Sequence, residues 1–99
     1  MENSLDKTDG YVLKLFITGA SPNSSKAITN IKAICDEYLK SGYKLDIIDI
    51  YKQPLMAQNE QIVALPLLIK LSPLPVKRLI GNMSDKDRVL KGLELDNAF

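Results

Sequence analysis

The sequence predicts one small α/β domain with the element order βαβαββα. A strand that is apolar on both faces comes first, and an amphipathic helix and a second strand follow it between residues 11 and 50. A proline-rich turn then separates two further short strands from each other. A chain of 99 residues has the length of a single domain, for which a radius of gyration of about 13 Å is expected.

The first expected strand is Tyr11–Ile17, in which Lys14 is the only charged residue. A strand that is apolar on both faces is typical of the centre of a sheet that is covered on both sides. Residues 1–9 are polar, which predicts a disordered tail. The folded domain is therefore expected to span residues 10–99.

The first helix is expected to begin after Ser21, with Pro22 in its first turn, because a hydroxyl caps exposed amides and a proline needs no partner there. Apolar residues at three- and four-residue spacing form one stripe, made of Ala27, Ile28, Ile31, Ile34, Cys35, Tyr38 and Leu39. Gly42 is the expected left-handed stop. The second strand, Lys44–Ile50, completes a βαβ unit, whose two strands run parallel.

The second half of the chain is less strongly specified. Gln53–Gln61 suits a short helix, and the apolar run Ile62–Leu71 suits a strand or a buried helix equally well. Within that run we expect a strand at Leu67–Leu71, followed by a turn at Ser72-Pro73-Leu74-Pro75. A strand at Val76–Ile80 would then pair with it as a hairpin.

The last helix is expected to begin with Ser84 as its cap, because Asp85 and Asp87 favour the positive end of a helix dipole. Val89, Leu90 and Leu93 would form its apolar side. Gly92 lies inside this helix, where glycine costs about 1 kcal/mol relative to alanine.

Composition excludes many classes of function. The chain has no histidine and one cysteine, so it lacks a Ser-His-Asp triad, an intrachain disulfide and a cysteine-rich zinc site. Its net charge of +1 argues against nucleic acid or an anionic membrane as the main partner. No segment approaches the roughly twenty apolar residues that span a bilayer. We therefore expect a cytoplasmic, non-catalytic binding protein with no cofactor and no metal.

The expected element order is that of the thioredoxin-like fold. That fold places Cys-x-x-Cys between the first strand and helix, and a cis-proline before the third strand. Here the first position reads Ser21-Pro22-Asn23-Ser24, and Pro66 stands at the second. A hydroxyl cannot replace a thiolate, so disulfide exchange is excluded there. Ser21–Ser24 then reads either as a plain helix cap or as a remnant turn reused for contact.

Several segments together resemble the KaiB family. They cover about residues 9 to 95 and read Tyr11-Val12-Leu13-Lys14-Leu15, Gly19-x-x-Pro22-Asn23-Ser24, Ala64-x-Pro66, Pro73-Leu74-Pro75-Val76, Ile80-Gly81-Asn82-Met83-Ser84-Asp85 and Arg88-Val89-Leu90-x-Gly92-Leu93. The resemblance implies a protein that binds the KaiC ATPase ring. It also implies a switch between a homo-oligomeric ground state, a tetramer or dimer of order βαββααβ, and a monomeric thioredoxin-like state that is competent to bind.

The resemblance also implies switch-sensitive positions at Tyr11, Gly92 and Glu94. We add Pro66, which reads as a cis-proline of an interaction surface or as a strand-edge bend. We also add Pro73 and Pro75, which read as a switch hinge or as an ordinary hairpin turn. The prolines give a physical reason for a slow switch, because X-Pro bonds isomerise over roughly tens of seconds. Replacing Gly92 by Ala is expected to favour the thioredoxin-like state and to tighten binding of KaiC.

The chain departs from the cyanobacterial pattern at three places. Glu94 stands where Asp is usual, Leu74 interrupts a run of three prolines, and the end Asp96-Asn97-Ala98-Phe99 lacks an acidic tail. These departures count against a circadian role with KaiA. They equally suit a KaiB–KaiC pair in a non-cyanobacterial host that serves timing or stress response.

Alternative interpretations stay open at this point. Lys70, Lys77 and Arg78 read either as a basic contact patch or as a solvated strand face. Cys35 reads as a small core residue, or as the reactive thiol of an enzyme. The whole chain also suits a redox-silent thioredoxin-like sensor or adaptor that binds another protein, such as a histidine kinase.

Overall fold

The structure is a computed structural model that describes residues 10–40, 42–62 and 64–95. Its elements are β1 (Val12–Ile17), α1 (Pro22–Tyr38), β2 (Lys44–Asp49), α2 (Pro54–Asn59), β3 (Leu67–Ser72), β4 (Lys77–Ile80) and α3 (Lys86–Gly92). This is the predicted order βαβαββα. The expected tail at residues 1–9 and the chain end at residues 96–99 lie outside the described residues.

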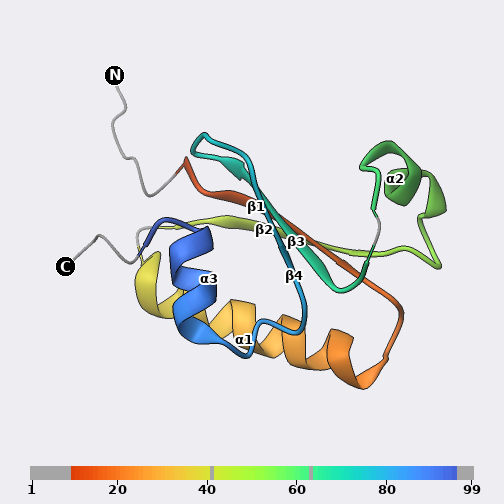
Figure 1. Cartoon of the computed structure of the whole chain (residues 1–99), viewed down its shortest axis with the longest axis horizontal. Helices are drawn as coiled ribbons and strands as arrows, with labels where there is room; N and C mark the ends of the chain where they lie inside the picture. Colours follow the sequence, from red (N-terminus) through yellow and green to blue (C-terminus); the bar gives the residue numbers. More distant parts are fainter. Residues whose placement is uncertain (1–9, 41, 63, 96–99) are drawn as a thin grey trace.

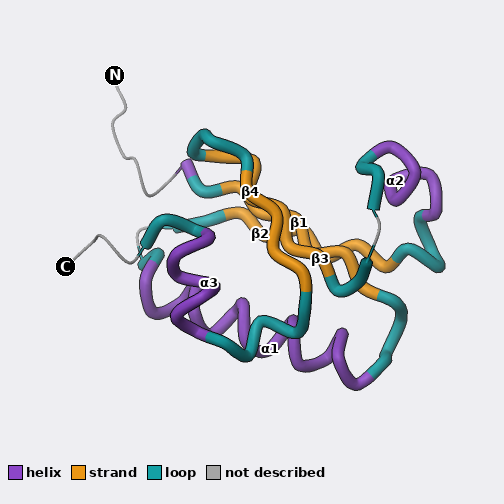
Figure 2. The backbone as a smooth tube through the Cα atoms, in the orientation of Figure 1, coloured by secondary structure: helices purple, strands orange, loops and turns teal. Residues whose placement is uncertain are grey.

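The strands form one sheet in the order β2-β1-β3-β4. β1 lies in the interior and runs parallel to β2, with Leu15 opposite Ile47, as the βαβ unit predicts. β3 runs antiparallel to β1 and to β4, so the apolar run after Pro66 is a strand and not a buried helix. Figure 2 shows the strands crossing the middle of the molecule with the helices outside them.

One face of the sheet is covered by α1 and α3, which lie together on the same side in Figure 1. The main hydrophobic core lies between this face and the two helices. Alternate residues of β1 point into it, namely Leu13, Leu15 and Ile17. The predicted stripe of α1 meets them, and Ala27, Ile31, Ile34, Cys35 and Leu39 are all buried. Cys35 is therefore a core residue, as the first of its two interpretations proposed.

The opposite face of the sheet holds a smaller core of four buried side chains. Phe16, Ile48, Leu67 and Ile69 form it, and Met56 of α2 packs against it. None of the residues of α2 is buried. Glu60, at the end of α2, ties this helix to the sheet, because its carboxylate lies 3.5 Å from Lys14 Nζ and its carbonyl accepts a hydrogen bond from Arg78.

The ends of the helices agree with the sequence in part. Ser21 caps α1, because its side chain accepts a hydrogen bond from the amide of Ser24. The expected cap of the last helix, Ser84, is wrong. Asp85 takes that position, and its carboxylate accepts from the amide of Arg88. A carboxylate at a helix N-terminus also gains from the helix dipole, which a serine hydroxyl does not. No helix in the described part of the chain is both long and apolar enough to cross a membrane.

Candidate functional site

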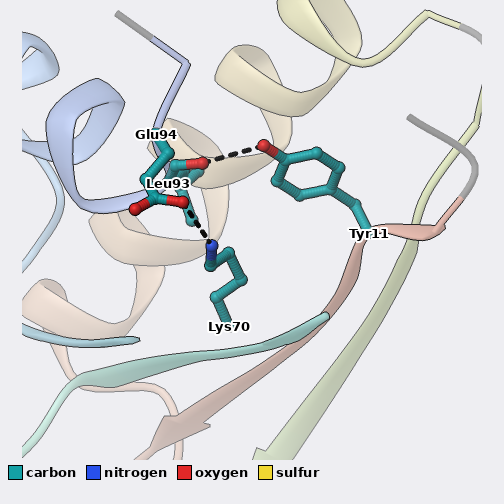
Figure 3. A network of polar contacts seen from close by, with 4 residues as sticks. All are labelled: Tyr11, Lys70, Leu93 and Glu94. Carbon is teal, nitrogen blue, oxygen red and sulfur yellow. Dashed lines mark hydrogen bonds and ion pairs between the residues drawn. The ribbon is translucent and has the colours of Figure 1, made fainter. Parts of the chain in front are cut away.

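Three of the predicted switch residues, Tyr11, Gly92 and Glu94, lie together around the end of α3. We call them, with Lys70 and Leu93, the α3-end cluster. Figure 3 shows how the side chains of Tyr11 and Lys70 reach from the sheet to the two residues that follow the helix. The prolines of the prediction lie elsewhere, in the connections before and after β3.

Tyr11 links the start of β1 to the other end of the chain. Its hydroxyl donates a hydrogen bond of 2.8 Å to the carbonyl oxygen of Leu93, 82 residues away (Figure 3). The side chain is buried, and burial, followed by the nearby Glu94 charge, raises the pKa of the phenol. The hydroxyl therefore stays protonated, as a donor to a carbonyl must be.

The chain leaves α3 through a tight turn that places Glu94 in an unusual conformation. The amide of Glu94 bonds to the carbonyl of Lys91, and the amide of Leu95 bonds to that of Leu90. This pair of bonds is the Schellman motif, in which the residue after the cap is left-handed and is usually glycine. Glu94 occupies that position with φ of 61°. A side chain in this region costs roughly 1–2 kcal/mol.

Glu94 is the ion-pair partner of a buried lysine. Lys70 Nζ lies 3.3 Å from Glu94 Oε1, and the Lys70 side chain is 0% exposed against 44% for Glu94. Both sequence interpretations of Lys70, as a contact patch and as a solvated residue, are wrong. Lys70 lies two residues after the buried Leu68 in β3. Residues two apart in a strand share a face, so Lys70 lies on the main-core face. A charge removed from water in this way depends on its partner.

Gly92 is the last residue of α3 and is helical, as predicted. A Cβ at this position would stand 2.6 Å from both terminal methyl carbons of Leu79 and 2.9 Å from its Cγ. Such distances require Leu79 to move. The expectation that Gly92→Ala simply favours this fold counted only helix propensity, and the contact with β4 opposes that gain.

The predicted prolines lie at the two ends of β3. The bonds Leu65–Pro66, Ser72–Pro73 and Leu74–Pro75 are all cis, so the expected cis-proline before the third strand is present. Leu74, between the last two prolines, is 76% exposed. The structure therefore does not bring the prolines into the α3-end cluster.

Where thioredoxins have their active-site cysteines, this chain has the hydrogen-bonded hydroxyls of Ser21 and Ser24. Ser21 Oγ donates to Ser24 Oγ at 2.8 Å, and Ser24 Oγ accepts from the amide of Thr18 at 3.1 Å. These bonds support the helix-cap interpretation. The only cysteine of the chain, Cys35, is buried in the core, and burial raises the pKa of its thiol from 9.0 to about 12. A protonated, buried thiol is a poor nucleophile. Among the described residues, no group of His, Cys, Asp and Glu could hold a metal ion.

Comparison with known proteins identifies the family. The family model described as "KaiB domain" matches residues 14–95. The chain is 45% identical over 85 residues to the circadian clock oscillator protein KaiB of Prochlorococcus marinus subsp. pastoris, a match that covers 86% of this chain and 79% of the relative. The chain belongs to the KaiB family. The KaiB of Synechococcus elongatus is 44% identical over 85 residues, with 86% and 83% covered.

Solved structures match the KaiB-family fold as well. The N-terminal domain of Synechococcus elongatus SasA superposes with a TM-score of 0.73 at 20% identity and covers 100% of this chain and 95% of that domain. Mitochondrial thioredoxin 3 of Saccharomyces cerevisiae gives a TM-score of 0.70 at 13% identity, with 89% and 80% covered. These likenesses confirm the thioredoxin-like fold and concern the fold alone.

Proposed function

We propose that this protein is a non-catalytic regulator that binds a KaiC-type ATPase ring and modulates its timing or stress-response output through a fold switch. Membership of the KaiB family over residues 14–95 is the observation that carries the proposal. The thioredoxin-like fold described above is then the binding-competent state. The ground state is a homo-oligomer, a tetramer or dimer, in which the second half packs in the order βαββααβ.

The energetics of the second half support a second packing. Lys70 places a charge in the main core, and Glu94 holds a left-handed conformation that favours glycine. The helix α2 buries none of its residues. Each of these features costs this fold free energy or contributes little to it, and all of them lie after residue 53. A fold switch requires two packings that differ by only a few kcal/mol.

A gap of that size sets the strength of binding. Apparent affinity falls by the fraction of the population that is competent to bind. A gap of about 2–3 kcal/mol in favour of the ground state would weaken binding about 30- to 150-fold. Substitutions that change the gap should therefore change the affinity for the ring without touching the interface.

The proposal is tested by sizing chromatography and two-dimensional NMR over a dilution series, followed by titration with a KaiC-type ring. We expect an oligomer that exchanges slowly with a monomer, and two sets of amide signals from residues after 53. The ring should deplete the oligomer and select the set that has β3 paired with β4. One rigid conformer at every dilution together with no association would contradict the proposal.

A second candidate function is that of an adaptor for another protein, such as a histidine kinase. The match to the SasA domain over the whole of this chain favours keeping it. Parallel capture experiments with a KaiC-type ring and with a candidate kinase discriminate the two functions. We expect capture of the ring, and no requirement for KaiA.

A further inference from the structure

We propose that the free edge of β4 binds an extended segment of a partner protein in which two apolar residues adjoin two acidic residues. The segment would add a strand to the sheet beside β4. This proposal goes beyond the proposed function, because it assigns a binding surface and the chemistry of its ligand.

The backbone at this edge is open for pairing. β4 is the last strand of the order β2-β1-β3-β4. The amide of Gly81 bonds to the carbonyl of Pro66, and Leu79 faces Leu68 in the register. Because antiparallel pairs alternate between bonded and non-bonded, the backbone groups of Arg78 and Ile80 point away from β3. An unpaired row of this kind is a template for another strand.

Three apolar side chains in β4 or just before it are exposed. Ile80 is 41% exposed, and Val76 and Leu74 just before the strand are 50% and 76% exposed. Ile80 and Arg78 also line a hollow with Leu67, Ala64 and Gln61. An added strand would place alternate side chains over this hollow. The other edge strand, β2, contains none of the exposed large apolar side chains of the described chain.

The charges at this edge select the occupant. Lys77 and Arg78 are exposed, and the guanidinium of Arg88 lies beside Gly81. Arg78 donates to a backbone carbonyl, that of Glu60, and no carboxylate pairs with Lys77 or Arg78 within residues 10–40, 42–62 and 64–95. A second copy of β4 that paired with Arg78 opposite Arg78 would place like charges directly opposite each other, which disfavours pairing. A carboxylate-bearing strand of a different protein complements it.

The register fixes the order of the residues in the ligand. Residues directly opposite each other in a sheet share a face. Acidic residues should therefore stand opposite Lys77 and Arg78, and apolar residues opposite Leu79 and Ile80. An antiparallel ligand then reads apolar-apolar-acidic-acidic from its N-terminus, for example Val-Val-Glu-Glu.

The test titrates the protein with acetyl-Thr-Thr-Val-Val-Glu-Glu-Thr-Thr-amide, and with a control peptide that has Lys in place of both Glu residues. Cross-strand NMR contacts between Leu68 and Leu79 identify the conformer observed, and no ring is present, so this test is separate from that of the proposed function. We expect the acidic peptide to shift the amides of Arg78 and Ile80 and to slow their hydrogen exchange. The control peptide should bind at least about tenfold more weakly.

Variants locate the contact. Arg78→Glu should weaken binding of the acidic peptide about tenfold and strengthen binding of the Lys peptide, whereas Lys32→Glu, exposed on α1, should change neither. Ile80→Pro removes an amide that β3 does not use, and should abolish binding while the signals of Leu68 and Leu79 persist. Equal binding of both peptides, or shifts confined to Lys44–Asp49, would overturn the proposal. So would concentration-dependent shifts of the Ile80 amide, without any peptide, within the conformer that shows the contacts between Leu68 and Leu79.

Discussion

At the scale of single residues, the buried ammonium of Lys70 is the most consequential feature of the α3-end cluster. It lies on the main-core face of β3, where neighbouring positions are apolar, and Glu94 is the partner of its charge. An ion pair of this kind is weak evidence for stability, because desolvation offsets most of the attraction. Removing one member is costly, because the charge that remains has no partner.

Glu94→Gln should destabilise this fold by about 1–3 kcal/mol, because it leaves Lys70 buried without a carboxylate. The loss stays below that of a fully buried pair, because Glu94 is 44% exposed and water can approach. Urea denaturation followed by the amide signals of α3 measures it. In a Lys70→Met background the same substitution should change the free energy of unfolding by less than about 0.5 kcal/mol. An equal loss in both backgrounds would show that the ion pair is not the cause.

Gly92→Ala should gain less than the roughly 1 kcal/mol that helix propensity alone offers, because the new methyl group meets Leu79. In a Leu79→Ala background the space is open and the gain should appear in full. The coupling between the two substitutions, measured by denaturation of the four proteins of the cycle, should be about 1 kcal/mol or more. Additive effects would show that the Leu79 side chain moves away from the new methyl group at no cost in free energy.

At the scale of elements, the N-cap of α1 gives a clean prediction. Ser21→Ala should lower the free energy of unfolding by about 1 kcal/mol, because the amide of Ser24 loses its acceptor. Ser25→Ala, one turn into the helix and exposed, is the matched control and should change it by no more than a few tenths of a kcal/mol. Thermal unfolding of both variants checks this. Since α1 belongs to the half of the chain that both proposed packings share, neither substitution should alter the affinity for a KaiC-type ring.

The elements themselves were largely predictable from the sequence, because their signals are local. The stripe of α1, the parallel βαβ unit and the hairpin of β3 and β4 follow from periodicity and turn residues. The cap of α3 was misassigned by one residue, because Ser84 and Asp85 are adjacent and both are good caps, so the sequence pattern does not separate them.

The cluster at the end of α3 was less predictable. Tyr11, Gly92 and Glu94 were found through resemblance to a family, since nothing in their spacing joins residue 11 to residue 93. Lys70 was missed because a lysine in an apolar run usually faces solvent. The two-residue spacing between Leu68 and Lys70, which puts both on one face of β3, was the available signal. It could be used only once the strand and its covered face were known.

At the scale of the whole molecule, stability should fall at high pH. Burial raises the pKa of the Cys35 thiol from 9.0 to about 12, so between these values the unfolded chain loses a proton that the folded chain keeps. The contribution of the thiol is fully present below pH 9 and is lost progressively as the pH rises toward 12. Denaturation of the native protein and of Cys35→Ala across this range separates the thiol from Tyr11 and Tyr43, whose pKa values are also raised. The native protein should lose stability more steeply than the variant.

The two faces of the sheet are covered very unequally. One face is covered by α1 and α3. The other is covered by α2, a helix of six residues with no buried side chain, which Glu60 connects to the sheet. Local opening takes place where the fewest apolar contacts must break. A protease added to the native protein should therefore cut first between residues 52 and 62. Cleavage there would release α2 from this face and expose the small core that contains Phe16. This face of the sheet would then be the part of the protein at which degradation begins.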